Sequence, residues 1–433
     1  MKLLKYNKKK LIICIIGGGY IGLPIAIAFA KKNIKVLLYD INKSRINTLK
    51  KKIDYNFETN KKDFSYFKKI KFTSNQKETS CANTYIITVP TPVKKDNKPD
   101  LSFIQTATNT VGSNLKENDL VIYESTVYPG LTEQICIPML EKKSNMNCSG
   151  ITFNSNKKYF HIGYSPERIN PGDKKHKLEK ISKIISSNNN YTVQYLKKLY
   201  GEIIDAKIVI AKNIKIAEAA KVIENSQRDL NIAFFNELSI IFKKLKINTN
   251  DVINVAKTKW NFINFKPGLV GGHCVGVDPY YLTHCCEKIN YNPEVILSGR
   301  KINNYIPKFI VKNFLMLNKQ KKITGKRVLI FGATFKENCN DVRNSKSIEV
   351  AKLLKKNNFK VDFFDPNVKY NKIFEFKNIK KIKKKYYSSA FFNVAHDQFK
   401  KLNINTIRSK LQKKNLIFDI QNIFSSSKTD FCL

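Results

Sequence analysis

Cys274 lies in a glycine-rich run, residues 267–279, whose residue types suit nucleophilic chemistry. Glycines stand on both sides of the thiol, and Asp278 follows it by four residues. Glycine lets the main chain approach a ligand closely, and a thiol needs that access to attack carbon. The run therefore predicts a covalent role for Cys274 rather than a packing role.

A second polar pair, Lys221 and Asn225, lies in a segment whose apolar spacing predicts a long helix. Residues four apart project from one helix face. An ammonium beside an amide would suit an alkoxide or oxyanion. A solvated helix face is the alternative in a lysine-rich chain. The polar run 225–229 interrupts an otherwise apolar helix, and this favours the functional interpretation.

Two loops carry further candidates, because each follows a strand-like run. Residues 124–130 contain Thr126, and residues 163–172 contain Glu167 and Arg168. Ligands of parallel sheets bind at the carboxyl ends of the strands. We therefore expect these side chains near a site, with an ordinary turn as the alternative for either loop.

The run Gly17-Gly18-Gly19-Tyr20-Ile21-Gly22 satisfies the pattern G-x-G-x-x-G between a predicted strand and a predicted helix. Gly17 permits the tight turn, Gly19 the close approach of a pyrophosphate, and Gly22 the packing of helix on strand. The helix N-terminus then offers free N–H groups and a positive dipole end to the phosphates. The run predicts a dinucleotide site.

Asp40 ends the strand that follows this helix. A carboxylate there accepts hydrogen bonds from ribose hydroxyls and repels a 2′-phosphate, which favours NAD over NADP. Lys43 and Arg45 lie nearby, and their positive charges leave NADP as an alternative cofactor. A second strand–helix–strand pattern has only Gly332-Ala333-Thr334 at its turn, so it predicts another nucleotide site or a structural role.

The alternation of strand and helix patterns predicts an α/β protein with two Rossmann-like, doubly wound parallel-sheet domains joined by a long central α-helix. That helix is expected at 214–245, a segment without Pro or Gly. Strands are predicted at 11–16, 34–39, 84–89, 120–123, 159–163, 327–332 and 360–365, with helices at 21–32 and 345–356.

Composition narrows the class of protein. The 433 residues allow two or three domains, and no apolar run approaches the ~18 residues of a membrane span. The charge of +44 would suit nucleic acid, but only seven of 78 basic residues are arginine and lysine is spread throughout, so we expect neither nucleic-acid nor membrane partners.

Nine scattered cysteines predict reduced thiols in a cytoplasm. Residues 273–274 with 284–286 match no standard zinc spacing, so no metal is predicted.

Several motifs in order resemble the UDP-glucose/GDP-mannose dehydrogenase family nearly end to end. They are the glycine run and residues 89–92, 124–130, 165–172, 219–225, 271–279 and 335–338. His273 before the thiol, residues 279–282 after it and residues 165–168 resemble the UDP-N-acetylhexosamine branch. Asn340 replaces the family's usual proline, and residues 380–394 match the usual third-domain strand poorly.

The resemblance implies a four-electron oxidation of the sugar's C6 alcohol to a carboxylate with two NAD. Cys274 would attack the aldehyde as a thiolate, and the thiohemiacetal would become a thioester that water hydrolyses. Lys221 and Asn225 would stabilise oxyanions, Asp278 with Thr126 would position water, and Glu167 would assist hydrolysis. The resemblance also implies cofactor contacts from Gly17, Gly19, Tyr20, Ile21, Gly22, Asp40, Arg45, Pro90, Thr91, Thr126 and Arg343, and substrate contacts from Glu167, Arg168, Lys221, Asn225, Arg300 and Lys336.

We therefore expect a cytoplasmic NAD-dependent UDP-N-acetylhexosamine 6-dehydrogenase, homodimeric through the long helix and serving surface-polysaccharide synthesis. The predicted domains are 1–205 (NAD-binding), 206–320 (helical, with the Cys274 loop) and 321–433 (UDP-sugar-binding). UDP-glucose 6-dehydrogenase is the alternative enzyme. A basic nucleic-acid-binding or scaffold protein is the alternative from another class, and the sugar epimer stays open.

Overall fold

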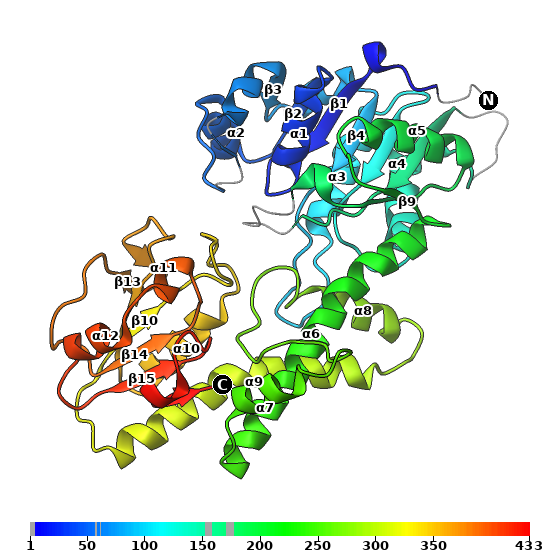
Figure 1. Cartoon of the computed structure of the whole chain (residues 1–433). Helices are drawn as coiled ribbons and strands as arrows, with labels where there is room; N and C mark the ends of the chain where they lie inside the picture. Colours follow the sequence, from blue (N-terminus) through cyan, green and yellow to red (C-terminus); the bar gives the residue numbers. More distant parts are fainter. Residues whose placement is uncertain (1–4, 57–58, 61, 152–157, 170–176) are drawn as a thin grey trace. The chain divides into compact units, whose positions relative to one another are not determined.

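The computed structural model describes residues 5–56, 59–60, 62–151, 158–169 and 177–433. The chain divides into two compact units. The N-terminal unit comprises Met1–Glu224 with Tyr280–Tyr291, and the C-terminal unit comprises Asn225–Pro279 with Asn292–Leu433. Helix α6 (Ile214–Leu245) contributes to both units, and its bounds are those predicted from the sequence (Figure 1).

The N-terminal unit is built on a parallel sheet with the strand order β3-β2-β1-β4-β5-β7-β6. Its strands are β1 (Ile12–Ile16), β2 (Lys35–Tyr39), β3 (Ile70–Thr73), β4 (Thr84–Ile87), β5 (Leu120–Tyr123), β6 (Asn147–Cys148) and β7 (Tyr159–Tyr164). A second parallel pair is formed by β8 (Lys183–Ile185) and β9 (Ile208–Ile210). The helices are α1 (Gly22–Lys31), α2 (Lys43–Lys50), α3 (Ser102–Gly112), α4 (Ile137–Ser144) and α5 (Asn190–Gly201).

The strand order explains where a ligand is expected in this unit. The chain leaves β1 in one direction to β2 and β3, and then returns to β4 on the other side of β1. The loop after β1 and the loop after β4 therefore lead in opposite directions along the sheet. Such a switch point is where open parallel sheets bind ligands. Apolar residues of α1 and α5 pack on one face of the sheet in a single core, and Figure 1 shows α1 beside β1 and β2.

The C-terminal unit repeats this plan with the order β12-β13-β11-β10-β14-β15-β16. Its strands are β10 (Arg327–Phe331), β11 (Lys360–Phe364), β12 (Lys372–Ile373), β13 (Phe376–Asn378), β14 (Ser389–Phe392), β15 (Leu416–Asp419) and β16 (Phe431–Cys432); β12 alone of these pairs antiparallel. The other helices are α7 (Thr249–Ala256), α8 (Asp278–Glu287), which crosses the boundary of the units, α9 (Glu294–Gln320), α10 (Lys346–Lys356), α11 (Asp397–Lys400) and α12 (Ile404–Lys410).

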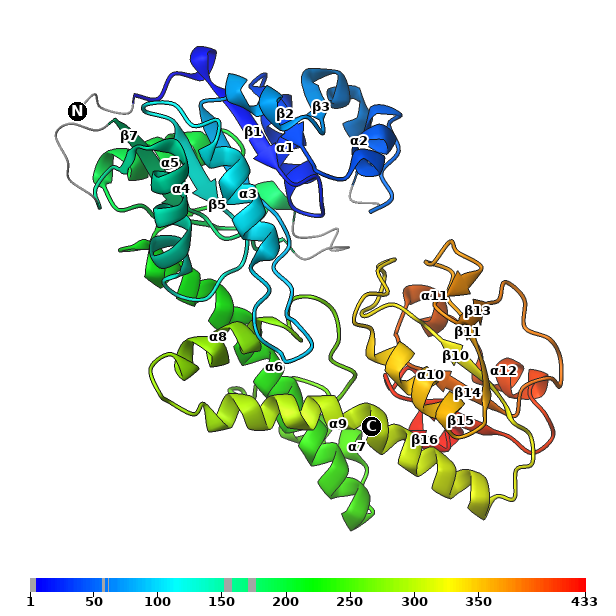
Figure 2. The same ribbon diagram turned by 180° about the vertical axis from the view of Figure 1, so that it is seen from behind.

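Alternation along β10 divides the C-terminal core between the two faces of its sheet. Val328 and Ile330 join a core with α9 and α10, whereas Leu329 and Phe331 join one with α11 and α12. Figure 2 accordingly shows α10 and α12 on opposite sides of the strands. Phe331 stacks on Phe392 of β14 with ring centroids 4.3 Å apart. Helices on both faces of two mainly parallel sheets confirm the predicted α/β class.

The structure also resolves the segment 380–394, which matches the family strand poorly in sequence. It contains β14, a buried strand that pairs with both β10 and β15. The lysine-rich flank before it hides this strand from pattern reading. Among the described residues, no helix is long and apolar enough to cross a membrane. The three predicted domain borders stay predictions.

Candidate active site

The glycine turn after β1 has the backbone that its sequence predicts. Gly17 takes φ 105°, and its N–H donates to the carbonyl of Tyr39 at 2.8 Å. A Cβ on Gly22 would lie 1.9 Å from the carbonyl oxygen of Gly17, so glycine is required there. A Cβ on Gly19 would meet no protein atom within 4 Å. The turn is therefore open at Gly19, where the pyrophosphate of NAD would lie.

Asp40 is held against this turn. Its Oδ2 accepts a hydrogen bond from the N–H of Gly18 (2.7 Å), and its Oδ1 accepts one from the N–H of Asn42 (2.8 Å). A carboxylate oxygen accepts more than one bond, so Asp40 can still receive ribose hydroxyls while its charge opposes a 2′-phosphate. Thr88, which follows β4 and which sequence reasoning misses, donates to the carbonyl of Gly17 (3.0 Å) and so supports the turn after β1.

Arg45 braces the same turn. Its Nε donates to the carbonyl of Gly18 (2.8 Å), and its guanidinium pairs with Asp54 at 2.9 Å. The arginine side chain is only 12% exposed. A guanidinium engaged on both sides by protein is poorly suited to receive a 2′-phosphate, so Arg45 gives little support to NADP.

A buried charge cluster joins the two loops predicted to carry polar site residues. Lys183, the first residue of β8, donates to Glu124 (2.7 Å) and to Glu167 (2.8 Å). The three side chains are at most 3% exposed. Tyr200 of α5 donates to the other oxygen of Glu124. Sequence reasoning misses Lys183, because one more lysine in this chain carries no signal.

The two carboxylates of this cluster share a single ammonium. Burial raises the pKa of Glu124 to about 7, against the opposing effect of Lys183. Burial also opposes ionisation of Glu167, but Lys183 and the N–H groups of Arg168 and Ile169 outweigh it and hold the pKa of Glu167 below its ordinary value. Glu167 is therefore the more readily ionised member, and Glu124 takes up a proton first as pH falls.

Arg168 lies against helix α6. Its guanidinium contacts the carboxylate of Glu224 at 2.8 and 3.3 Å and donates to the carbonyl of Ser182 at 3.2 Å. Glu224 follows Lys221 by three residues, so the two side chains are neighbours on the helix surface. Arg168 is thereby placed beside the helical turn that carries Lys221.

The Cys274 loop turns tightly into helix α8. The carbonyl of Cys274 accepts hydrogen bonds from the N–H groups of Val277 (2.9 Å) and Asp278 (2.8 Å). The buried carboxylate of Asp278 accepts a 2.6 Å bond from the side-chain amide of Asn225. Three predicted catalytic residues, Cys274, Asp278 and Asn225, are thus brought together within the C-terminal unit.

The two glycines before His273 pack directly on the segment after β10. A Cβ on Gly271 would lie 2.5 Å from the carbonyl oxygen of Asn344. Gly272 takes φ 84°, and a Cβ there would lie 2.6 Å from the ring of Phe335. Glycine is required at both positions by these close contacts.

Arg343, a predicted cofactor contact, lies in that same segment. Its guanidinium pairs with Asp341 at 2.6 Å, and the imidazole of His273 lies 3.6 Å from the same carboxylate. Burial, together with the charge of Arg343, lowers the pKa of His273 against the effect of Asp341. The residue before the thiol is therefore a neutral imidazole at neutral pH.

A cavity of about 670 Å³ lies beside the segment after β10. Four lysines line it: Lys266, the predicted substrate residue Lys336, Lys346 and Lys400. Helix α10 begins at Lys346, so its positive N-terminal end also lies at the cavity. The cavity is suited to an anionic ligand such as a diphosphate.

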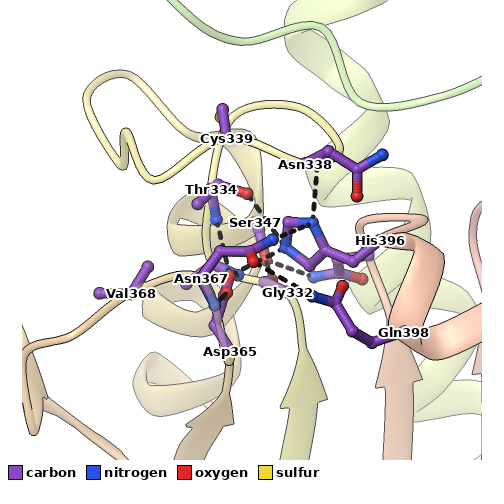
Figure 3. A network of polar contacts seen from close by, with 12 residues as sticks. Gly332, Thr334, Asn338, Cys339, Ser347, Asp365, Asn367, Val368, His396 and Gln398 are labelled. Carbon is purple, nitrogen blue, oxygen red and sulfur yellow. Dashed lines mark hydrogen bonds and ion pairs between the residues drawn. The ribbon is translucent and has the colours of Figure 1, made fainter. Parts of the chain in front are cut away.

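His396 fixes the same segment from within the C-terminal core (Figure 3). Its ring is fully buried, and its Nδ1 accepts from the N–H of Asn338 and the amide of Asn367, both at 2.9 Å. Because Nδ1 accepts, the ring proton is on Nε2, which lies 3.2 Å from Asp365. His396 is a second residue that sequence reasoning misses.

Asp365 corresponds in position to Asp40, since each follows the second strand of its sheet. Asp365 also accepts the N–H of Ala333 in the turn after β10, at 2.7 Å. Its carboxylate is thus engaged by His396 and by backbone. The engaged carboxylate of Asp365 does not suit the ribose of a dinucleotide. Thr334 of this turn lines the cavity described above, so the interpretation as another nucleotide site stays open beside the structural one.

The remaining predicted residues are placed by the elements that carry them or follow them. Arg300, 4% exposed, donates to Asp229 at 2.7 Å and fastens α9 to α6, so substrate contact by Arg300 stays a prediction. Thr126, Pro90 and Thr91 lie just after β5 and β4. Residues 170–172 of the 165–172 motif lie outside the described residues. No metal-binding group of three or more His, Cys, Asp or Glu side chains occurs in the described part of the chain.

Relatives are found along almost the whole chain. A UDP-N-acetyl-D-glucosamine 6-dehydrogenase from Salmonella typhi is 45% identical, covering 96% of this chain and 97% of its own. One from Pseudomonas aeruginosa is 43% identical, covering 98% and 100%. A UDP-N-acetyl-D-mannosamine dehydrogenase from Methanococcus aeolicus is 32% identical, covering 98% and 94%. Among solved structures, a UDP-D-ManNAc dehydrogenase from Pyrococcus horikoshii has a TM-score of 0.86 at 27% identity, with 98% of both chains covered.

Three parts of the chain match one protein family. Residues 11–204 match its NAD binding domain, residues 215–305 its central domain and residues 329–426 its UDP binding domain. The glycine turn and Asp40 lie in the first of these, and most of the residues that line the cavity lie in the last. The protein is an NAD-dependent nucleotide-sugar dehydrogenase, and its chain belongs to the UDP-glucose/GDP-mannose dehydrogenase family.

Proposed function

We propose that this enzyme oxidises the C6 hydroxyl of a UDP-N-acetylhexosamine to the uronic acid, with UDP-N-acetyl-D-glucosamine as the first candidate. The observation that carries the proposal is the 45% and 43% identity, over nearly full length, to two dehydrogenases named for that sugar. The relatives named for the mannosamine epimer reach 32% and 33%. Full-length similarity at the higher level favours glucosamine over mannosamine.

The cavity of the C-terminal unit would receive the UDP part of the substrate. Lysines outnumber the one acidic residue of its lining, Glu337, although Lys346 and Lys400 also pair with carboxylates. The N-terminus of α10 adds N–H donors suited to phosphate oxygens. Asn393, 1% exposed, lines the cavity and donates its amide to Ser347. A cationic cavity with a helix N-terminus fits a pyrophosphate better than a neutral ligand.

The chemistry proposed for Cys274 links two oxidations. The C6 alcohol gives up a hydride and a proton to become an aldehyde, and bound NAD supplies the hydride acceptor in each oxidation. The thiolate of Cys274 adds to the aldehyde carbon, and the resulting thiohemiacetal loses a second hydride and becomes a thioester. Water cleaves the thioester to a carboxylate and restores the thiol. Two NADH form for each sugar, and covalent capture retains the reactive aldehyde.

The polar neighbours would stabilise charge on oxygen during these steps. Asn225 and Lys221, one turn apart on α6, would contact the developing oxyanions. Asp278 with Thr126 would position the water that cleaves the thioester. Glu167 already accepts hydrogen bonds from Lys183 and two backbone N–H groups. We therefore expect Glu167 to assist hydrolysis through its fixed negative charge rather than by taking a proton.

The proposal includes a homodimer in which the two copies of the chain contact each other through α6. Large exposed apolar side chains on this helix recur at intervals of whole turns and so form one stripe along it. They are Ile216, Ile223, Phe234, Ile241 and Leu245. A second copy of the chain would cover this stripe, and light scattering of Phe234→Glu should then show a monomer where the unmodified protein is a dimer. Cytoplasmic location and a product used for surface polysaccharide complete the proposal.

The substrate panel tests the proposal. NADH formation is measured with UDP-N-acetyl-D-glucosamine, its galactosamine and mannosamine epimers, and UDP-glucose at equal concentration. The expected result is the highest kcat/KM with UDP-N-acetyl-D-glucosamine and two NADH per sugar consumed. A higher kcat/KM with UDP-glucose would establish the alternative enzyme. Absence of NADH with every sugar, together with tight binding of nucleic acid, would instead favour the basic binding protein.

A further inference from the structure

The cavity and the Cys274 loop share one segment of the chain, residues 333–345. Phe335 and Ser345 of this segment line the cavity. Phe335 and Asn344 also contact the two glycines that precede His273 and Cys274. All these residues belong to the C-terminal unit. The segment therefore touches a ligand space on one side and the loop of the nucleophile on the other.

The contact of Phe335 with the loop is closely packed. Its ring occupies the space beside Gly272 that a Cβ would fill, with Cδ2 2.6 Å from that position. The same ring meets the imidazole of His273 edge to face, with centroids 5.4 Å apart and an interplanar angle of 68°. Close packing transmits displacement rather than absorbing it. A shift of the Phe335 ring must therefore move Gly272 or His273.

Asn344 holds the same glycine through the main chain. Its carbonyl accepts the N–H of Gly272 at 3.2 Å, and its side-chain amide reaches the carbonyl of Gly272 at 3.4 Å. Asn344 takes φ 51°, a left-handed conformation that asparagine tolerates better than most residues. The direction of its carbonyl, and so the position of Gly272, depends on this conformation.

The segment itself is tied together and anchored. The N–H of Phe335 donates to the carbonyl of Asp341 at 3.0 Å, which closes the loop on itself. Ser345 donates to the carbonyl of Thr334 at 3.1 Å, and Asn338 is held by His396. A loop with these internal bonds shifts as one piece when one side of it is pushed.

We propose that UDP in the cavity sets the position, and with it the reactivity, of the Cys274 thiol through Phe335 and Asn344, which act as positioning residues. The proposal rests on the proposed function in taking UDP as the ligand of the cavity. A ligand changes a conformational equilibrium only through contacts that differ between the states. Phe335 provides such a contact, because it lines the cavity and packs on the loop at once.

The test measures alkylation of Cys274 by iodoacetamide in the full-length protein, with and without saturating UDP. Peptide mass spectrometry reads Cys274 separately, and the exposed Cys81 serves as internal reference. Calorimetry sets the saturating concentration for each variant. The variants are Phe335→Leu, which shrinks the shared ring, and Asn344→Val, which places a β-branched residue at a left-handed position. Asn358→Val is the matched control, since Asn358 is also left-handed (φ 64°) but follows α10 away from the loop.

The expected result is a change of at least about fivefold in Cys274 alkylation on UDP binding, a coupling of about 1 kcal/mol, in the unmodified protein and in Asn358→Val. Phe335→Leu and Asn344→Val should bind UDP but lose this change, and Asn344→Gly should restore it because glycine takes the left-handed conformation freely. An undiminished UDP effect in both variants would mean direct shielding of the thiol and overturn the proposal. UDP binding with no effect in the unmodified protein would overturn the coupling alone, whereas no UDP binding would overturn the nucleotide site as well.

Discussion

The side-chain amide of Asn225 donates a 2.6 Å hydrogen bond to the carboxylate of Asp278, four residues after Cys274. The bond joins helix α6 to the loop of Cys274, whose carbonyl in turn accepts the N–H of Asp278. A short bond to a charged acceptor fixes both partners more firmly than a bond between neutral groups. The position of the thiol is thereby tied to the helix that also carries Lys221.

The first prediction follows from this bond. Asn225→Asp would place two carboxylates in contact, and their repulsion is relieved only when the pair takes up one shared proton as pH falls. We expect a fall in kcat of about 100-fold at neutral pH, partly recovered at lower pH, because general catalysis by such groups contributes roughly 10²–10⁴-fold. The pH profile of kcat is the measurement. Gln227→Glu, on an exposed position of the same helix, is the control, and an unshifted profile in Asn225→Asp would contradict the prediction.

The second prediction concerns the thiol. Cys274→Ala removes the proposed nucleophile without adding bulk, so steady-state NADH formation should fall by about 1000-fold or more, the order found when a covalent nucleophile is removed. The affinity for NAD should stay within about threefold, which calorimetry measures, because the glycine turn is unchanged. Cys81→Ala provides an exposed-thiol control. Turnover at the unmodified rate in Cys274→Ala would rule out the covalent mechanism.

The third prediction concerns the choice of cofactor at Asp40. Asp40→Ser removes the carboxylate that is predicted to bind the ribose but keeps a small acceptor for the N–H of Gly18. We expect KM for NAD to rise about tenfold, as hydrogen bonds to a charged group are worth roughly 1.5–3 kcal/mol. The preference for NAD over NADP should narrow, because the repulsion of a 2′-phosphate is gone. Asp205→Ser, an exposed aspartate of the same unit, should leave the ratio unchanged. An unaltered NAD/NADP ratio in Asp40→Ser would remove Asp40 from the cofactor site.

The fourth prediction concerns the buried cluster around Lys183. Lys183→Met leaves Glu124 and Glu167 facing each other without a counter-charge, and loss of one partner from a buried pair costs about 3–5 kcal/mol. The double variant Lys183→Met/Glu124→Gln removes one of the two carboxylates and should recover part of that loss. Urea unfolding followed by circular dichroism measures both. Lys180→Met is the exposed control. Equal stability of Lys183→Met and Lys180→Met would show that the cluster contributes nothing.

Sequence patterns predict those parts of the fold and site whose signal is local. The bounds of α6, the strands β1 and β5 and the glycine turn all follow from spacing within a few residues, and the structure agrees with each to within a residue. The strand β14 is missed by pattern because lysines precede it, although its four residues are all buried. The periodicity of a short apolar segment cannot show which strands will lie beside it and bury it.

The contacts that support the site join residues far apart in the sequence, and local patterns do not predict them. Lys183 meets Glu124 and Glu167 only after the sheet has formed, and His396 meets Asn338 across the C-terminal unit. Neither residue has a spacing relation to its partners in the sequence. The only available signal is chemical: a strand such as β8 that begins with a buried lysine requires a buried anion nearby. That rule predicts that a partner exists but not which residue it is.

The last prediction concerns the pH dependence of stability that Glu218 confers. This carboxylate is fully buried on α6, accepts the N–H groups of Gly130 and Thr132, and burial raises its pKa from 4.5 to about 7. A raised folded-state pKa means that the folded chain binds the proton more tightly than the unfolded chain. The stabilising contribution is therefore complete below the unfolded value and is lost as pH rises through about 7, by up to about 3 kcal/mol.

Glu218→Gln replaces the carboxyl with a permanently neutral group of the same shape. The amide keeps only one acceptor oxygen, so one of the two backbone N–H bonds is lost at every pH. The Tm of Glu218→Gln relative to the unmodified protein should nevertheless rise between about pH 4.5 and about pH 8, because only the carboxyl must ionise in the buried site. Glu237→Gln, exposed on the same helix, should follow the unmodified protein at both pH values. Thermal unfolding followed by circular dichroism gives the comparison. If the difference in Tm between Glu218→Gln and the unmodified protein is the same at both pH values, the carboxylate titrates at its ordinary pKa and the two backbone N–H bonds fully offset its burial.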